Sequence, residues 1–308
     1  MSKPTVFITS ATGTQGHAVA TLLSPTHDLI ATARSPSSPA AQSLSSLGVT
    51  VAPASWSDTA ALSAALSRST HLFLNLFPTL SDPSQEAKTA STILALAKEH
   101  GIQHVVYSSV IPTHTLAGYD ANNPSHPYRQ AKLDIEEIVK KADIPWTIIR
   151  PGFLMANFVE GKIEFQFPGA KETGVFRFLE GVSDVRLPVV DEVDVARFVK
   201  KTFEEPKRFV GQVLEVVSEV VGFERVVEAL ARVTGREIER QVAKEEEVRD
   251  EERFALQNLK MLIGFDELVD LEEVIRWGVE LGSWEGWLER RKEDVKRTFA
   301  GVPAKKTT

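Results

Sequence analysis

Residues 5–34 read TVFITSATGTQGHAVATLLSPTHDLIATAR, and four structural elements follow one another in this stretch. An apolar run rich in β-branched residues, 5–9, predicts a buried strand. A turn of small residues comes next, and apolar residues then recur at helical spacing. A second apolar run, 29–33, ends at Arg34. Strand, tight glycine turn, helix and strand are the parts of a nucleotide-binding βαβ unit.

The glycine turn predicts a phosphate-binding site. Gly13 lets the backbone approach a pyrophosphate, and Gly16 lets the helix pack close to the strand. The free N–H groups and the positive dipole end of that helix then face the phosphates. The dinucleotide-binding pattern has a glycine where Ser10 stands, so an ordinary strand-to-helix turn is the alternative on the turn alone. The candidate cofactor-binding residues of this turn are Ser10, Thr12, Gly13, Thr14, Gln15 and Gly16.

Arg34 and Ser35, at the end of the second predicted strand, favour NADP(H) over NAD(H) as the cofactor. NAD sites usually have an Asp or Glu at this position, and its carboxylate would repel a 2′-phosphate. Arginines are rare in residues 1–125, so an arginine here by chance is the less favoured explanation. A solvated arginine at a strand end is the alternative.

Strands and helices alternate as far as residue 150. Further strands are predicted at 49–52, 71–76, 105–108 and 145–150, with helices at 41–47, 59–66, 83–99 and 128–142. This order predicts an α/β fold with a doubly wound parallel sheet and right-handed crossovers. Ligands of such sheets bind beyond the carboxyl ends of the strands. There we expect, besides Gly13 and Arg34, the residues Asn75, Leu76, Phe77, Ser108, Ser109 and Pro151.

The length of 308 residues suggests about two domains. We expect an NADP(H)-binding Rossmann domain at 1–150, a smaller, mostly helical substrate or partner region at 151–303, and a disordered tail at 304–308. Residues 184–204, with a helix capped by Asp191, are expected to pack back on the first domain. Phenylalanines are dense in 151–183 and could line an apolar pocket, although aromatics at such density more often form core.

These residues, with three later segments, resemble the NmrA-like family, an atypical branch of the short-chain dehydrogenase/reductases. The segments are HVVYSSV at 104–110, AKLDIEEIVKKADIPWTIIRPGFLMANF at 131–158 and RLPVVDEVDVARFVKKTF at 186–203. The resemblance covers nearly the whole chain and implies a Rossmann fold that binds NADP(H). The family includes both reductases and redox sensors without catalysis.

Tyr128 and Lys132 form a Tyr-x-x-x-Lys pattern on a predicted helix, where positions i and i+4 share a face. The ammonium can stabilise the phenolate and lower the pKa of the tyrosine, which suits acid–base work. In the short-chain reductases that the chain resembles, the tyrosine protonates a carbonyl oxygen and the lysine also holds the nicotinamide ribose. A serine at the end of the fifth strand polarises the carbonyl, and Ser109, or else Ser108, stands at that position.

The alternative is that Tyr128 packs near the start of its helix and that Lys132 holds only the ribose. A proton donor would then be Tyr119, His114, His126 or water.

Composition excludes several function classes. The net charge of −7 argues against direct nucleic-acid contact and provides no basic membrane patch. The absence of cysteine excludes disulfides, thiolate catalysis and zinc–thiolate sites, and it fits a cytoplasmic protein. No signal peptide, no apolar run near the ~20 residues of a membrane helix and no metal site are expected.

Two functions therefore compete. The first is an NADPH-dependent reductase of a carbonyl, quinone or enone in an apolar or aromatic small molecule. The second is a non-catalytic NADP(H)-binding redox sensor that docks on a protein partner. Tyr128 favours the reductase, whereas the cofactor motif is common to both functions.

Overall fold

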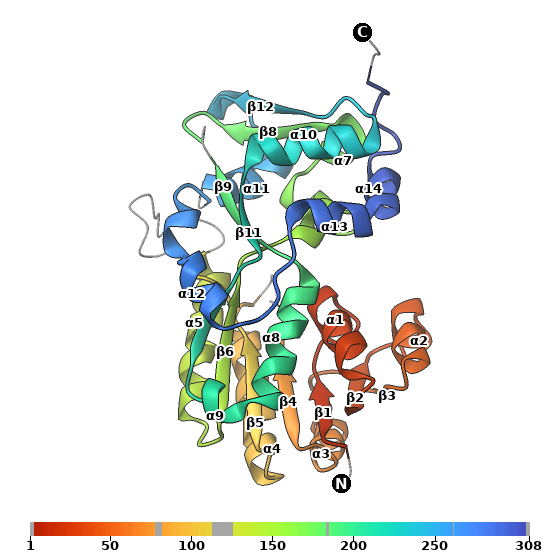
Figure 1. The fold of residues 1–308 in the computed structure, drawn as a ribbon, viewed down its shortest axis with the longest axis vertical. Coiled ribbons are helices and arrows are strands. Elements are labelled where there is room, and N and C mark those ends of the chain that lie inside the picture. Colours follow the sequence, from red (N-terminus) through yellow and green to blue (C-terminus); the bar gives the residue numbers. More distant parts are fainter. Residues whose placement is uncertain (1–2, 78–81, 113–125, 183–184, 261, 306–308) are drawn as a thin grey trace.

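A central parallel sheet organises the computed structural model, which describes residues 3–77, 82–112, 126–182, 185–260 and 262–305 (Figure 1). The order of its seven strands is β10-β6-β5-β4-β1-β2-β3. They are β1 (Thr5–Ile8), β2 (Asp28–Ala33), β3 (Thr50–Pro53), β4 (His71–Leu74), β5 (His104–Ser108), β6 (Trp146–Pro151) and β10 (Val213–Val216). The predicted α/β fold with a parallel sheet is confirmed, and its seventh strand comes from far along the chain.

Helices cover both faces of this sheet, as a doubly wound fold requires. They are α1 (Thr14–Leu23), α2 (Pro39–Ser46), α3 (Thr59–Leu66), α4 (Ser84–Glu99), α5 (His126–Lys141), α8 (Glu192–Glu204) and α9 (Pro206–Phe209). Val19 and Phe198 bring α1 and α8 into one hydrophobic core. Leu62, Ile93 and Ile135 bring α3, α4 and α5 into another. None of the helices in the described ranges is long and apolar enough to cross a bilayer.

The remaining elements form a second body around an aromatic core, above the sheet in Figure 1. Its strands form two small sheets, with the orders β11-β9-β7 and β12-β8, so strands accompany the helices expected there. The strands are β7 (Phe153–Leu154), β8 (Val175–Leu179), β9 (Arg186–Val190), β11 (Glu219–Gly222) and β12 (Glu239–Ala243). The helices are η1 (Met155–Phe158), α6 (Ile163–Gln166), α7 (Ala170–Thr173), α10 (Phe223–Thr234), η2 (Glu245–Glu247), α11 (Asp250–Lys260), η3 (Phe265–Leu268), α13 (Trp284–Arg290) and α14 (Lys292–Thr298). The helix α12 (Leu271–Arg276) packs instead against β10 of the main sheet.

The phenylalanines of residues 151–183 belong mainly to this aromatic core. Phe158, Phe167, Phe176 and Phe178 are buried and pack on one another or on Phe223. Two others line a pocket: Phe153, which is buried, and Phe165, which is 47% exposed. The dense aromatic stretch therefore serves chiefly as core and only partly as a pocket wall.

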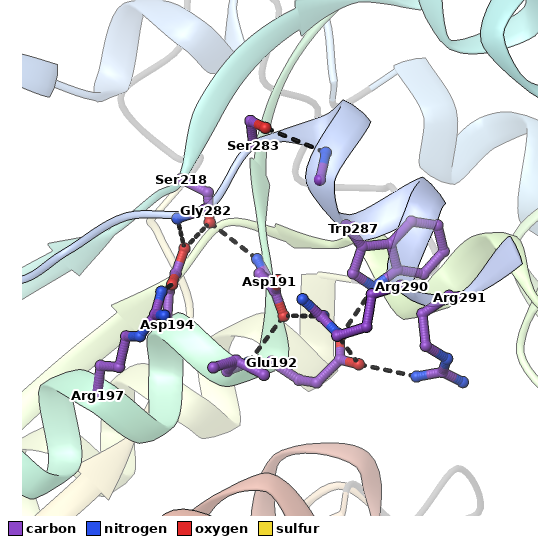
Figure 2. A network of polar contacts seen from close by, with 12 residues as sticks. Asp191, Glu192, Asp194, Arg197, Ser218, Gly282, Ser283, Trp287, Arg290 and Arg291 are labelled. Carbon is purple, nitrogen blue, oxygen red and sulfur yellow. Dashed lines mark hydrogen bonds and ion pairs between the residues drawn. The ribbon is translucent and has the colours of Figure 1, made fainter.

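A group of buried acids at the start of α8 joins the two bodies (Figure 2). Asp191 caps the helix, as the sequence predicts, and accepts a hydrogen bond of 2.7 Å from Arg290 of α13. Glu192 accepts hydrogen bonds from Arg291 at 2.8 Å and from the indole N–H of Trp287 at 3.2 Å. Because α8 also packs against α1, these hydrogen bonds fix α13 and Arg291 to the sheet layer.

Asp194, one turn further along α8, binds two more segments to the start of this helix. Its Oδ2 accepts hydrogen bonds from the Ser218 hydroxyl at 2.5 Å and from the Gly282 N–H at 2.7 Å (Figure 2). Its Oδ1 accepts another from Arg197 at 2.8 Å. Carboxylates in the first turn also suit the positive end of the helix dipole. The whole carboxyl group of Asp194 is thus satisfied, although the residue is completely buried.

The last described residues pair with the second body. The Lys305 N–H donates to the Gly235 carbonyl at 2.9 Å, and Ala304 forms a β-bridge with Arg236. The sequence places these two residues in the 304–308 tail, and the other three tail residues lie outside the described ranges.

His104 and His71 lie in the sheet beside Phe203, with ring centroids 5.7 and 4.9 Å from it. The Thr147 hydroxyl donates to the Phe209 carbonyl, so it accepts from the Nε2–H of His104 at 2.8 Å. The Nδ1 atom of His104 is buried without a hydrogen-bond partner. Protonation there would add an unpaired charged donor, and burial accordingly lowers the pKa of His104 to about 4.

We expect this histidine to make the protein less stable in mild acid. An unfolded histidine has a pKa of about 6.5, so its stabilising contribution is complete above that pH and is lost as the pH falls towards 4. Between pH 7 and 5 the loss should be about 1–2 kcal/mol of unfolding free energy. His104→Gln should reduce this pH dependence in urea titrations, whereas the control His17→Gln on α1 should retain it. An equal pH dependence in both variants would contradict the assignment.

Candidate active site at the carboxyl end of the sheet

The turn between β1 and α1 has the close packing that a phosphate-binding turn needs. A Cβ atom on Gly16 would lie 2.5 Å from the Ser10 carbonyl oxygen, so only glycine fits there. Ser10 itself adopts a left-handed backbone with φ 47°. Glycine reaches this conformation without strain, and the pattern has glycine at this position. The turn closes with serine there because Ser10 adopts the same left-handed backbone.

The N-terminus of α1 is open to a ligand. Gly13 is its N-cap, and no side chain caps the first N–H groups. Those groups point along the axis with the positive end of the helix dipole, an arrangement that suits a phosphate. Thr12 is exposed beside this end, and Thr14 and Gln15 are partly exposed.

Hydrogen bonds tie this turn to the neighbouring strand ends. The Ser108 hydroxyl at the end of β5 donates to Gln15 Oε1 at 2.7 Å. The Asn75 N–H, just after β4, donates to the Thr9 hydroxyl at 2.7 Å. The predicted edge residues of β1, β4 and β5 therefore lie together. Ser108 has a structural role here that the sequence does not indicate.

Arg34 and Ser35 are exposed at the carboxyl end of β2. Within the described ranges the Arg34 side chain forms no hydrogen bond or ion pair, so its guanidinium is available to an anion. After β4, Leu76 is buried, whereas Phe77 is exposed.

Lys132 is buried at the centre of the site. Its Nζ lies 2.5 Å from Glu86 Oε1 and donates to the Leu76 carbonyl at 2.6 Å. Glu86 is on the first turn of α4 and is itself buried. Burial raises the pKa of Glu86, and the ammonium of Lys132 opposes that rise. The lysine thus links α5, α4 and the end of β4.

Glu86 is absent from the predicted site residues. Its position in the sequence could have identified it. Glu86 lies in the first turn of the helix after the fourth strand, and that turn starts at the ligand-binding edge of the sheet. An acidic residue there is also favoured by the helix dipole alone, so the pattern does not distinguish a buried partner from a surface acid.

Two further contacts fix α5 on the sheet. The hydroxyl of Tyr107 on β5 donates to the Lys132 carbonyl at 3.2 Å. Arg150 of β6 donates two hydrogen bonds, of 2.9 and 2.7 Å, to the carboxylate of Glu136. Such bidentate pairs restrict orientation as well as distance. The backbone that carries Lys132 is therefore held from two strands.

A pocket of about 270 Å³ opens beside Lys132. It lies between α5, the end of β6, α6 and α11, and its walls are mainly apolar. Tyr128 lines it, with its ring 6.3 Å from the Phe254 ring of α11. Pro151, at the end of β6, and Phe153 also line it. Tyr128 and Lys132 therefore share one pocket, the arrangement that acid–base chemistry on a small molecule requires.

The two predicted serines lie outside the residues that line this pocket. The Ser109 hydroxyl is buried, and no hydrogen bond of normal geometry joins it to another described residue, while Ser108 is bonded to Gln15. Of the alternative proton donors, His126 begins α5, and Tyr119 and His114 lie outside the described residues.

Removing the carboxylate of Glu86 should destabilise the protein strongly. Glu86→Gln leaves the Lys132 ammonium buried without a counter-charge, which should cost about 3–5 kcal/mol of unfolding free energy in urea titrations. The control Glu99→Gln, on the exposed face of the same helix, should change it by less than about 0.5 kcal/mol. Adding Lys132→Met to Glu86→Gln should restore part of the loss. Equal effects of the two single substitutions would mean that the pair is not a structural constraint.

Comparison with known proteins places these features in a family. The model of the NmrA-like family matches residues 2–287. The NmrA-like family domain-containing oxidoreductase FrzB of Cladobotryum sp is 28% identical over 250 residues, which are 75% of this chain and 74% of that protein. Quinone oxidoreductase 2 of Escherichia coli (strain K12) is 26% identical over 203 residues, which are 65% and 64% of the two proteins.

Solved structures show the same fold. The NADPH-dependent quinone oxidoreductase QOR2 of Escherichia coli, complexed with NADPH, superposes with a TM-score of 0.70 at 22% identity and covers 92% of this chain and 99% of its own. The negative transcriptional regulator NmrA, in complex with NADP, gives a TM-score of 0.66 at 19% identity, with 98% and 93% covered. From the match over nearly its whole length, the chain belongs to the NmrA-like family.

Proposed function

We propose that this protein is an NADPH-dependent oxidoreductase that reduces a carbonyl, quinone or enone group of an apolar small molecule. The observation that carries the proposal is the position of Lys132. Its ammonium bonds the Leu76 carbonyl at the predicted cofactor edge, and its side chain also lines the apolar pocket. One charged group thus connects the proposed dinucleotide site with the proposed substrate site. The similarity to FrzB and quinone oxidoreductase 2, which are both named oxidoreductases, supports the proposed oxidoreductase function.

The residues of the sheet edge fit NADP(H). The open N-terminus of α1 suits the pyrophosphate, and the unpaired guanidinium of Arg34 suits the 2′-phosphate. Leu76, Phe77 and Pro151 would hold the nicotinamide end near Lys132. The bound cofactor supplies the hydride, and the side chains of this chain handle the proton and the charge.

Tyr128 is the residue that we assign as proton donor to the substrate oxygen, because it lines the pocket one helical turn from Lys132. Lys132 stabilises negative charge that develops on that oxygen, and Glu86 keeps the ammonium in place. We assign carbonyl polarisation to Lys132 rather than to Ser109, since the Ser109 hydroxyl is buried outside the pocket lining.

A redox sensor is the second candidate, and the similarity to the NADP-bound regulator NmrA favours it. A sensor would use the same cofactor residues but would not need a proton donor at Tyr128. Assays that separate binding from turnover therefore distinguish the two functions.

Arg34 should select the cofactor. Arg34→Ala removes a charge-assisted hydrogen bond worth roughly 1.5–3 kcal/mol, so NADPH binding should weaken about tenfold to a hundredfold in calorimetry. NADH binding should hardly change, and Arg68→Ala, another exposed arginine of the same layer, serves as control. Equal affinity of the unmodified protein for NADPH and NADH would refute the assignment.

Tyr128 should matter for turnover and not for cofactor binding. Tyr128→Phe removes one oxygen, so NADPH oxidation with naphthoquinone or aromatic aldehydes should fall about 10²–10⁴-fold, with an unchanged NADPH dissociation constant. Lys132→Met should lower turnover and also weaken NADPH. If the unmodified protein oxidises no NADPH with any acceptor and Tyr128→Phe changes nothing measurable, the sensor function is favoured instead.

A further inference from the structure

Arg129 lines the apolar pocket next to Tyr128, and no described acid pairs with it. Within the described part of the chain its side chain forms no hydrogen bond or ion pair. Other partly buried arginines behave differently. Arg150 pairs with Glu136, Arg177 with Glu252 and Arg291 with Glu192, at 2.7, 2.5 and 2.8 Å respectively. The guanidinium of Arg129 is therefore an exception that a role in the fold does not explain.

The described lining of the pocket contains no acid that could balance this charge. None of the described residues that line it is an aspartate or glutamate. The other cation there, Lys132, already has its own carboxylate in Glu86. Pairing Arg129 with Glu86 would leave Lys132 without a counter-ion, so the described residues around the pocket carry one net positive charge.

Arg129 is half-buried, and removing part of a cation from water costs free energy. Burial lowers the pKa of Arg129 to about 10, and no neighbouring charge contributes to the shift. The group still carries its proton at neutral pH. An isolated charge in an apolar environment is costly unless an opposite charge or hydrogen-bond acceptors accompany it. An anionic ligand in the pocket would remove that cost.

Asn258 provides an independent indication of a polar ligand. It lines the same pocket from α11, and its Oδ1 is buried without a hydrogen-bond partner. Buried polar atoms in proteins are nearly always satisfied, so this oxygen also needs a group that the described chain does not supply. Two groups of opposite character that the described residues do not satisfy thus lie in one mainly apolar pocket.

We propose that Arg129 binds a carboxylate of the substrate, so that the natural acceptor is an apolar carbonyl, quinone or enone compound carrying a carboxylate. The planar fork of a guanidinium matches the two oxygens of a carboxylate and forms two parallel hydrogen bonds. Asn258 accepts a hydrogen bond from a hydroxyl or amide of the same molecule. The proposal rests on the reductase function, because it treats this pocket as the substrate site.

A matched pair of acceptors tests the proposal. The probes are a naphthoquinone with a carboxymethyl group and the methyl ester of the same compound. With the unmodified protein, kcat/KM for the acid should exceed that for the ester about tenfold to a hundredfold, the worth of a charge-assisted hydrogen bond. Arg129→Met should abolish this preference by lowering the value for the acid only, and Arg129→Lys should retain part of it. The control Arg276→Met, an exposed arginine at the end of α12, should retain all of it.

Binding without turnover separates this proposal from the proposed function. Naphthylacetate and its methyl ester cannot be reduced by hydride, and calorimetry with the NADPH-loaded protein measures their affinity directly. The acid should bind at least about tenfold more tightly, and Arg129→Met should remove the difference. If neither quinone is reduced but naphthylacetate still binds through Arg129, the reductase function fails and the carboxylate site stands. Equal binding of acid and ester, or an Arg129→Met variant whose only defect is weaker NADPH binding, would overturn the carboxylate site.

Discussion

The ion pair between Lys132 and Glu86 is the constraint on which the site depends. Both groups are buried, and the attraction between them must offset the cost of removing two charges from water. Neither partner can leave without exposing the other to that cost. The contact therefore fixes α4 against α5 and, through the Leu76 carbonyl, fixes both against the end of β4.

Ion pairs of a buried carboxylate also hold α11, the helix that forms the outer wall of the pocket. Glu252 on α11 accepts hydrogen bonds from Arg249 at 2.6 Å and from Arg177 of β8 at 2.5 Å. These arginines, Arg249 foremost, lower the pKa of Glu252 to about 2, so the carboxylate stays charged at neutral pH. The helix that brings Phe254 and Asn258 to the pocket is thereby fixed to the second body. The acids at the start of α8 fix that body to the sheet layer (Figure 2). A cavity between two parts of a fold keeps its shape only if both parts are restrained in this way.

The sequence signals for the proposed cofactor half of the site are local. Residues 5–34 carry strand, turn and helix in consecutive order, and the close approach at Gly16 follows from that order. The alternation of strands and helices then determines which residues share the carboxyl edge. The pattern could not show that Ser10 replaces glycine by adopting a left-handed backbone, since serine rarely does so.

The substrate half is less predictable, because it depends on contacts between distant segments. The spacing of Tyr128 and Lys132 predicts that they share a helix face, but Glu86 lies 46 positions before Lys132 and pairs with it only in the folded chain. Residues of α11 reach the pocket from more than 100 positions beyond Tyr128, and no local spacing connects the two segments. The place of the seventh strand, β10, beside β6 follows from packing and not from local pattern.

Single-turnover reduction is the most direct test of whether the pocket beside Lys132 is an active site. Protein loaded with one equivalent of NADPH is mixed with excess naphthoquinone without oxygen, using coenzyme deuterated on one or the other face of the nicotinamide. If hydride leaves the coenzyme inside this pocket, the whole equivalent should be oxidised in one phase, and that phase should slow with deuterium on one face only. Coenzyme that stays bound and unoxidised under these conditions would contradict the account and leave the chain as a binding protein.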